Sequence, residues 1–186
     1  MACTLTLANS RKLPCIKSRV GIRAIYVFPF DATDKVVTTV AGVVALPTYI
    51  ATTDGARYDI KSTTANYTDT LTQNLDNRSG GRKGELPVII VPNSGVDNVK
   101  LAEEIDQISK TESLIFLEMK NGDTFAIGSQ FGCNISTAVD TTGGQSGDLD
   151  GVTMTIQTDE SDSFRKYWLS STAVTALQAA VLPHDV

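Results

Sequence analysis

A short run of small and acidic residues late in the chain has the spacing of a calcium-binding loop. The stretch 143–158 reads GGQSGDLDGVTMTIQT. Counted from Ser146, Asp148 and Asp150 fall at the third and fifth positions of such a loop, and a glycine falls at its sharp turn. The twelfth position, Gln157, lacks the bidentate carboxylate that supplies much of the affinity for calcium. Asp148 and Asp150 are therefore only weak candidates for a metal site.

The residues that follow this run argue against an EF-hand, which needs a helix on each side of its loop. Val152, Met154 and Ile156 instead alternate with polar residues, which is the period of a strand. The stretch is better explained as a Gly/Asp turn that begins a late sheet strand. Asp148 and Asp150 then serve turn geometry, because their short side chains accept hydrogen bonds from nearby backbone N–H groups. A calcium site in a β-turn is the alternative.

The chain lacks the groupings of residues on which most enzymes depend. Its single histidine, His184, lies beside Pro183 near the end of the sequence, where no supporting residue for acid–base chemistry is indicated. No G-x-S-x-G, H-E-x-x-H or P-loop motif occurs. Gly80 and Gly81 lack the strand-to-helix context of a dinucleotide fold. We therefore expect a protein that is not an enzyme and uses no cofactor.

The cysteines give no sign of a disulfide framework or a zinc site. Cys3, Cys15 and Cys133 are odd in number, and no two of them form a C-x-x-C pair. We expect all three to be plain thiols, as is usual in a reducing compartment.

Composition indicates one soluble domain spanning 1–186. Hydrophobic residues make up 41% and charged residues 20% of the 186 positions, an ordinary balance for a chain with its own core. The net charge of −5 argues against a protein that grips nucleic acid by its phosphates. The opening MACTLTLANSRK has no continuous apolar core, and no run approaches the ~20 apolar residues of a membrane span. These features predict a chain that is made in the cytoplasm and has no signal peptide.

The pattern of strands and turns predicts a mainly β fold, a sandwich or barrel of about nine strands. The strongest local signal is Asn121-Gly122 between two apolar runs, which is typical of a hairpin. Residues 1–19 are expected to form an N-terminal arm, and 170–186 a C-terminal extension. The strands are expected at 21–31, within 35–53, within 57–75, and at 86–92, 113–119, 123–129, 131–137 and 152–158, with a last one ending near Trp168.

One firm helix is predicted within 93–112, flanking the strands. Asn93 or Ser94 can cap its N-terminus. A second, short helix is expected at 171–181. The stripe that should pack the first helix against the core consists of Val96, Val99, Ala102, Ile105 and Ile108.

A long protruding hairpin, 62–86, carries the candidate contact residues. Its tip is expected to be a polar loop at 76–85, which reads DNRSGGRKGE and is too polar for any core. Arg78, Arg82 and Lys83 place positive charge there on an otherwise acidic protein. They are candidates for docking on an acidic patch of a neighbouring subunit, and a solvated, mobile loop is the alternative.

The order of these pieces resembles the tail tube and tail-ring proteins of tailed bacteriophages, best over roughly residues 57–164. The similar segments run from DNRSGG and LPVIIVP through LAEEIDQI and LIFLEM to NGDTFAIGS and SGDLDGVTMTIQTDESDSF. The opening, with GIRAIYVFPFD, is similar too. The unusually apolar segment 35–53 and the last 20 residues depart from the pattern. The most similar single positions are Asn121, Gly122 and Gly128 in the hairpin and Gly147, Asp148 and Gly151 in the late turn.

This resemblance implies a structural virion subunit. Such subunits have a β-sandwich with one flanking helix, close into a ring, usually of six, and stack through extended loops into a tail tube or a tail/neck ring. The implied partners are further copies of the chain and other tail or neck proteins. Viral DNA passes through the lumen without specific binding, and no membrane is involved. The implied location is the virion, after synthesis in the host bacterial cytoplasm. The alternative function is a small calcium- or glycan-binding β-sandwich module.

Overall fold

The computed structural model describes residues 21–35, 37–38, 44–60, 65–74, 79–91, 95–141, 151–160 and 162–181. In chain order the elements are β1 (Ile22–Pro29), β2 (Val37–Thr38), β3 (Val44–Ala45), the 3₁₀ helix η1 (Thr48–Thr52), β4 (Ala56–Asp59), β5 (Thr68–Asn74), β6 (Ser79–Ile90), α1 (Gly95–Lys110), β7 (Ser113–Met119), β8 (Thr124–Ile127), β9 (Cys133–Thr141), β10 (Gly151–Glu160), the 3₁₀ helix η2 (Phe164–Lys166) and α2 (Ser171–Ala179). The predicted mainly β fold with a flanking helix is confirmed.

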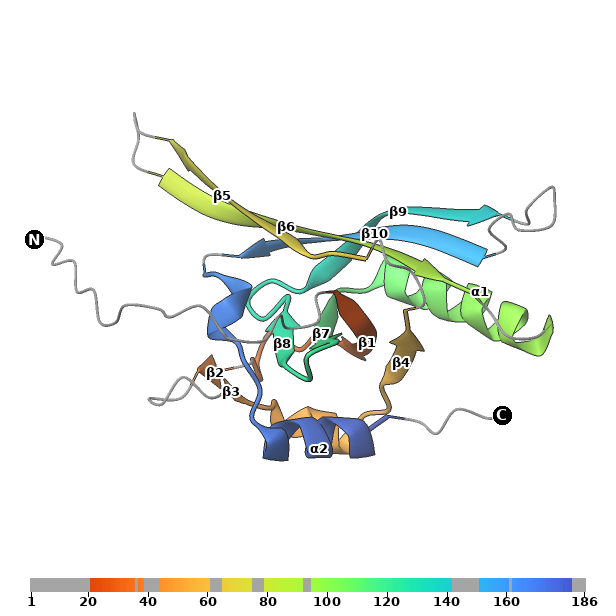
Figure 1. Ribbon diagram of the computed structural model, residues 1–186, viewed down its shortest axis with the longest axis horizontal. Helices are drawn as coiled ribbons and strands as arrows, with labels where there is room; N and C mark the ends of the chain where they lie inside the picture. The colour runs from red at the N-terminus through yellow and green to blue at the C-terminus, as the bar shows by residue number, and fades with distance from the viewer. Residues whose placement is uncertain are drawn as a thin grey trace, which may run out of the picture.

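The main sheet has eight antiparallel strands that separate into two layers (Figure 1). The upper layer, in the order β9-β10-β6-β5, lies across the lower layer, which contains β4, β1, β7 and β8. A single pair, Ser113 and Cys133, joins β7 of the lower layer to β9 of the upper layer. The result is a β-sandwich whose two layers are parts of one continuous sheet.

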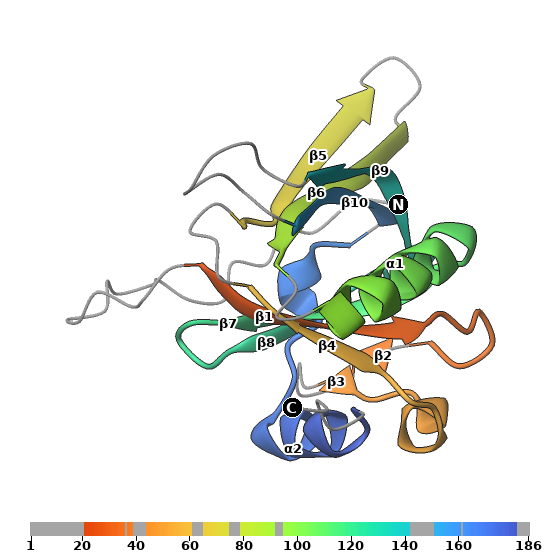
Figure 2. The same ribbon diagram turned by 90° about the vertical axis from the view of Figure 1, so that its right-hand side faces the viewer.

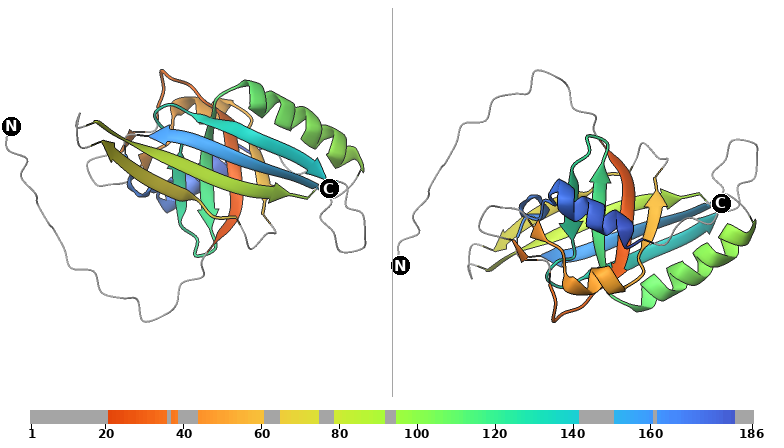
Figure 3. Two further views of the ribbon diagram at one scale, coloured as in Figure 1. Left: turned by 90° about the horizontal axis from the view of Figure 1, so that it is seen from above. Right: turned by 90° about the horizontal axis from the view of Figure 1, so that it is seen from below.

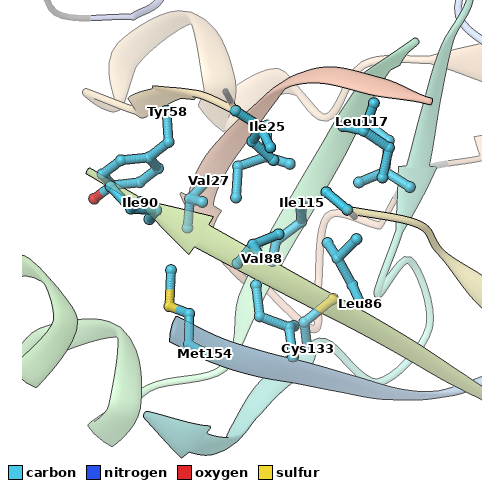
Figure 4. Packing of buried hydrophobic residues seen from close by; sticks show 14 of the residues in the cluster. Ile25, Val27, Tyr58, Leu86, Val88, Ile90, Ile115, Leu117, Cys133 and Met154 are labelled. Carbon is cyan, nitrogen blue, oxygen red and sulfur yellow. The ribbon is translucent and has the colours of Figure 1, made fainter. Parts of the chain in front are cut away.

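The first core fills the space between the two layers. Alternate residues of β6 and β10 point down into it, including Leu86, Val88 and Met154, as the strand period requires. They meet Ile115 and Leu117 of β7, which are both fully buried (Figure 4). The alternation of Val152, Met154 and Ile156 therefore marks a buried strand face, as predicted, and all three are buried.

A second core covers the opposite face of the lower layer. In β1 and β7, the residues that point away from the first core include Phe28, Leu114 and Phe116, and they pack against η1 and α2. Figure 3 shows α2 lying across this face of the sheet. The anchor of α2 is Leu177, which is fully buried, and the hydroxyl oxygen of Ser170 caps its first turn by accepting from the N–H of Ala173 at 3.2 Å. The predicted second helix is thus present and covers a core.

Helix α1 lies along the open side of the sandwich (Figure 2). Its buried stripe differs from the predicted one, because Leu101 is 7% exposed whereas Val99 is 61% exposed and Ala102 is also exposed. Ile105 and Ile108 do pack against the first core. The predicted stripe repeats every three residues and drifts around a helix of 3.6 residues per turn, whereas Leu101, Ile105 and Ile108 follow the i, i+4, i+7 spacing that stays on one face.

The polar segment expected as a loop at 76–85 is largely strand. Residues 79–85 belong to β6 and pair with β5 on one side, and residues 82–85 pair with β10 on the other. Backbone pairing on both sides overrides the loop composition of this segment, because ladder hydrogen bonds do not depend on side-chain polarity. Gly84 also has a packing role, since a Cβ there would lie 2.0 Å from the hydroxyl oxygen of Tyr67.

Three shorter predictions can also be compared with the structure. The Asn121-Gly122 hairpin is confirmed between β7 and β8, and Gly122 has the positive φ of 92° that favours glycine. Within 35–53 the described residues form the short strands β2 and β3 and the helix η1. Among the described residues, neither helix is long and apolar enough to cross a membrane.

A methyl group at Gly55 should destabilise the second core. A Cβ at this buried position would lie 2.3 Å from the ring of Phe28, which is itself 1% exposed and has no room to move. We expect Gly55→Ala to lower the free energy of unfolding by about 1–3 kcal/mol through overpacking, measured by urea denaturation. Gly81→Ala is the matched control, because a Cβ there meets nothing within 4 Å. Equal effects of the two substitutions would contradict this packing.

Candidate functional site

The hairpin formed by β5 and β6 projects beyond the lower layer of the sandwich (Figure 1). Burial along the downward face of β5 falls with distance from the body. Tyr67, just before the strand, is half-buried and packs edge-on against Phe164 with ring centroids 4.8 Å apart. The side chain of Asp69 is 8% exposed, and Leu71 is 50% exposed. Leu71 is therefore a large apolar side chain on the free part of the hairpin.

Arg82, a predicted docking residue, is bound within its own subunit. Its Nη1 donates to Oδ2 of Asp69 at 2.9 Å across the β5–β6 pair. The two side chains are 24% and 8% exposed, so the ion pair is largely shielded from water and salt. This pair fixes the two strands to each other at the point where the hairpin leaves the body.

Lys83 lies on the opposite, upper face of the hairpin. Its side chain is half-exposed, and Nζ is 3.6 Å from a carboxylate oxygen of Glu85. An exposed pair of this kind contributes little to stability and leaves the ammonium accessible to a partner. Arg78, the third predicted docking residue, lies outside the described residues. The docking role of all three stays a prediction.

The upper face of the four-stranded layer is covered by no described element (Figure 3). Its side chains alternate with those of the first core, and threonines dominate it. The outermost strand, β5, has a strand partner on one side only among the described residues. Beyond Ser113–Cys133, β9 likewise pairs only with β10 in the described chain. The threonines on this face are Thr68, Thr70, Thr72, Thr137, Thr141, Thr153 and Thr155.

A buried carboxylate, Glu160, holds the loop that joins β8 to β9. Its Oε1 accepts the backbone N–H of Ser129 at 2.7 Å, and the backbone N–H groups of Gly128 and Gln130 also bond to it. Successive N–H groups of this kind form an anion-binding nest. Burial nevertheless dominates and raises the pKa of Glu160 above its ordinary value. The carboxylate therefore positions the loop but is penalised when it is ionised.

The cysteines, the histidine and the weak metal candidates form no catalytic or metal-binding grouping within the described residues. Cys133 is fully buried, and burial together with the charge of Glu160 raises the pKa of its thiol, which disfavours the nucleophilic thiolate. No group of three or more His, Cys, Asp or Glu residues that could hold a metal ion occurs in the part of the chain that the structure describes. Asp148, Asp150, His184, Cys3 and Cys15 lie outside that part.

Two buried acids were not predicted, although the sequence carries a signal for each. Glu160 continues the inward series of Met154 and Ile156, so strand period alone places it inside. Glu118 follows the apolar run of β7 in the same way and is 7% exposed. Its carboxylate accepts from the hydroxyl of Tyr26 at 2.7 Å and pairs with Arg23 at 3.1 Å. When an Asp or Glu continues the alternating series of buried residues in a strand, it therefore indicates a buried carboxylate that is hydrogen-bonded within the protein.

Comparison with known proteins adds no relative, because no family model, curated protein or solved structure matches this chain.

Removal of Arg82 should lower stability, whereas removal of Lys83 should not. Arg82→Ala leaves the nearly buried carboxylate of Asp69 without its partner, and we expect a loss of about 1–3 kcal/mol in the free energy of unfolding. Lys83→Ala, on the exposed face, should stay within about 0.5 kcal/mol of the parent. Denaturant unfolding of both variants measures this difference. A neutral Arg82→Ala variant would show that the ion pair does not hold the hairpin.

Glu160→Gln should change the pH dependence of stability. Because the folded pKa of Glu160 is raised, the folded state holds the proton more tightly than the unfolded state. The stability that this bound proton adds to the folded state is complete below the ordinary pKa of glutamate. It is lost as pH rises through the raised pKa of Glu160. The free energy of unfolding of the parent minus that of the variant should therefore fall as pH rises through the raised pKa of Glu160, measured by thermal unfolding over a pH series that starts below the ordinary pKa of glutamate. A difference that grows with pH would mean that the nest outweighs burial.

Proposed function

We propose that this chain is a structural virion subunit that forms rings, and that these rings stack into a phage tail tube or a tail/neck ring around a channel for DNA. The observation that carries the proposal is the upper layer of the sandwich. It combines a face that no described element covers, an outer strand, β5, with a described strand on one side only, and a hairpin that projects past the body. A monomer gains nothing from open strand edges, which natural proteins usually block. The sequence resemblance to tail tube and tail-ring proteins supports the same function.

The strand order of the upper layer suits ring closure. In the order β9-β10-β6-β5 each neighbouring pair is antiparallel, so β5 and β9 run in opposite directions. Placing β5 of one copy beside β9 of the next continues the antiparallel order across the contact. Such a contact joins two different surfaces, and contacts of this type generate rings when the rotation closes. A ring of six is the number that the resemblance implies.

The uncovered face suits the wall of a DNA channel. Its threonine hydroxyls are uncharged, and the chain as a whole has a net charge of −5. Phosphate binding by counterion release requires clustered cations, and Lys83 on this face is paired with Glu85. A wall of this chemistry lets DNA slide without holding it.

The hairpin supplies the contact between stacked rings. Leu71 on its free part offers apolar area that a neighbouring ring would bury, at about 25 cal/mol per Å². The role of docking residue therefore extends to Leu71, beside the predicted Arg78, Arg82 and Lys83.

Assembly of the purified protein tests the proposal directly. Sedimentation over a range of concentrations and negative-stain microscopy should show rings or tubes. A protein that stays monomeric at every concentration and shows neither form would refute the proposed function.

A negative charge on the hairpin should block stacking. We expect Leu71→Glu to fold like the parent, because a substitution at a half-exposed position changes stability by about 0.5 kcal/mol or less. It should fail to form tubes, since a carboxylate would have to leave water while the arginine opposite it, Arg82, is already bonded to Asp69. Val99→Glu is the matched control, because Val99 is equally apolar and 61% exposed but lies on α1. If Leu71→Glu forms tubes as long as those of the control, the hairpin is not the stacking contact.

A further inference from the structure

The loop between β8 and β9 presents an aromatic ring, Phe131, to solvent. The side chain is 59% exposed, which is unusual for phenylalanine in a loop that is otherwise firmly held. Gly128 and Gly132 both have φ of 75°, and a Cβ on Gly132 would lie 2.8 Å from that of Glu112. The loop conformation therefore requires glycine on both sides of the ring.

Two charged side chains fix this loop from opposite directions. Glu160 accepts the N–H of Ser129 from inside, as described above. From outside, Nζ of Lys35 donates to the carbonyl of Gln130 at 2.8 Å and lies 5.7 Å from the centroid of the Phe131 ring. The backbone next to Phe131 is therefore held in place before any ligand arrives, which lowers the entropy lost on binding.

A groove of about 500 Å³ opens beside Phe131, on the upper face of the sheet. It is an open surface groove and not an enclosed cavity. Its polar lining comes from adjacent strands in register: Asn134 lies opposite Gln157, and Asp159 lies opposite Lys83. Glu112 completes the lining beside the loop. The side-chain amide of Gln157 is oriented by Glu85, to which it donates at 3.1 Å.

The chemistry of this groove matches a neutral carbohydrate. The aromatic ring offers an apolar face to the C–H groups of a sugar, and the two amides and two carboxylates offer donors and acceptors for its hydroxyls. An anionic ligand is disfavoured, because the groove is lined by two carboxylates, Glu112 and Asp159, and its one lining ammonium, Lys83, already pairs with Glu85. The ammonium of Lys35, beside the Phe131 ring, is bonded to the carbonyl of Gln130. We propose that the groove between Phe131 and the Asn134–Gln157 pair binds one or two rings of a neutral oligosaccharide.

Titration with defined sugars tests this site. Maltotriose, cellotriose and N,N′,N″-triacetylchitotriose would be added to the isotope-labelled protein, and backbone amide shifts followed by NMR. We expect one of them to bind with a dissociation constant of about 1 mM, shifting the amides of the loop and of β9 and β10. Phe131→Ala should weaken that binding about tenfold or more, as loss of a central aromatic contact does. Val139→Ala is the control: Val139 is an exposed apolar residue of β9 on the same sheet face, outside the groove lining, and its loss should leave binding unchanged.

Two outcomes would overturn the proposal: none of the three sugars shifts the groove amides at about 20 mM, far above that dissociation constant, or Phe131→Ala binds as the parent does. The result is separable from ring assembly. Phe131 lies off the hairpin and off the pairing edges of β5 and β9, so Phe131→Ala should form the same rings as the parent whether or not sugar binds.

Discussion

The fold depends on one constraint, the burial of β7 on both of its faces. Ile115 and Leu117 point toward the upper layer, while Leu114 and Phe116 point toward α2, and all four are at most 1% exposed. A strand of this kind needs cover from two directions, as in the interior of a layered domain. The upper layer supplies one cover, and η1 with α2 supplies the other. With both covers in place the core is complete, and no described element covers the far side of the upper layer.

The upper face of this layer carries polar side chains that a partner could contact. Its hydroxyls and open edges belong to strands whose other face is committed to the core, so partner contacts there need not disturb the fold. The hairpin is the exception, because beyond the Arg82–Asp69 pair it has no core beneath it. Contact with a neighbour there adds burial that the isolated chain lacks. The groove beside Phe131 differs again, since internal bonds of Glu160 and Lys35 hold its loop independently of any neighbour.

Local pattern predicted most of the strands, the helix α1 and the Asn-Gly hairpin, because each has a period or a turn residue that acts over a few positions. The strand expected to end near Trp168 is wrong, since that segment holds the 3₁₀ helix η2 and isolated bridges at Trp168 and Leu169. It failed where the decisive neighbour is distant in sequence. Residues 79–85 read as a loop, and only pairing with β5 and β10 makes them strand. Leu71 alternates as a buried residue would, yet it lies past the end of the layer beneath it. The bond of Arg82 to Asp69 within its own subunit was not predicted, because Asp69 becomes its neighbour only once the hairpin forms. The groove escaped prediction because its lining comes from four separate segments of the chain.

The pairing of β1 with β7 has a consequence for how the protein is made. β1 is synthesised early, yet its Arg23 bonds to Glu118, 95 residues further along the chain. The second core needs still later residues, since Leu177 and the bond from Gly55 to Ala180 close it. Neither core can therefore form on a growing chain until most of the sequence has left the ribosome, and contacts of such long range fold slowly. The four-stranded layer that presents the outer strands β5 and β9 therefore forms only after β10, which joins β6 to β9, has been synthesised.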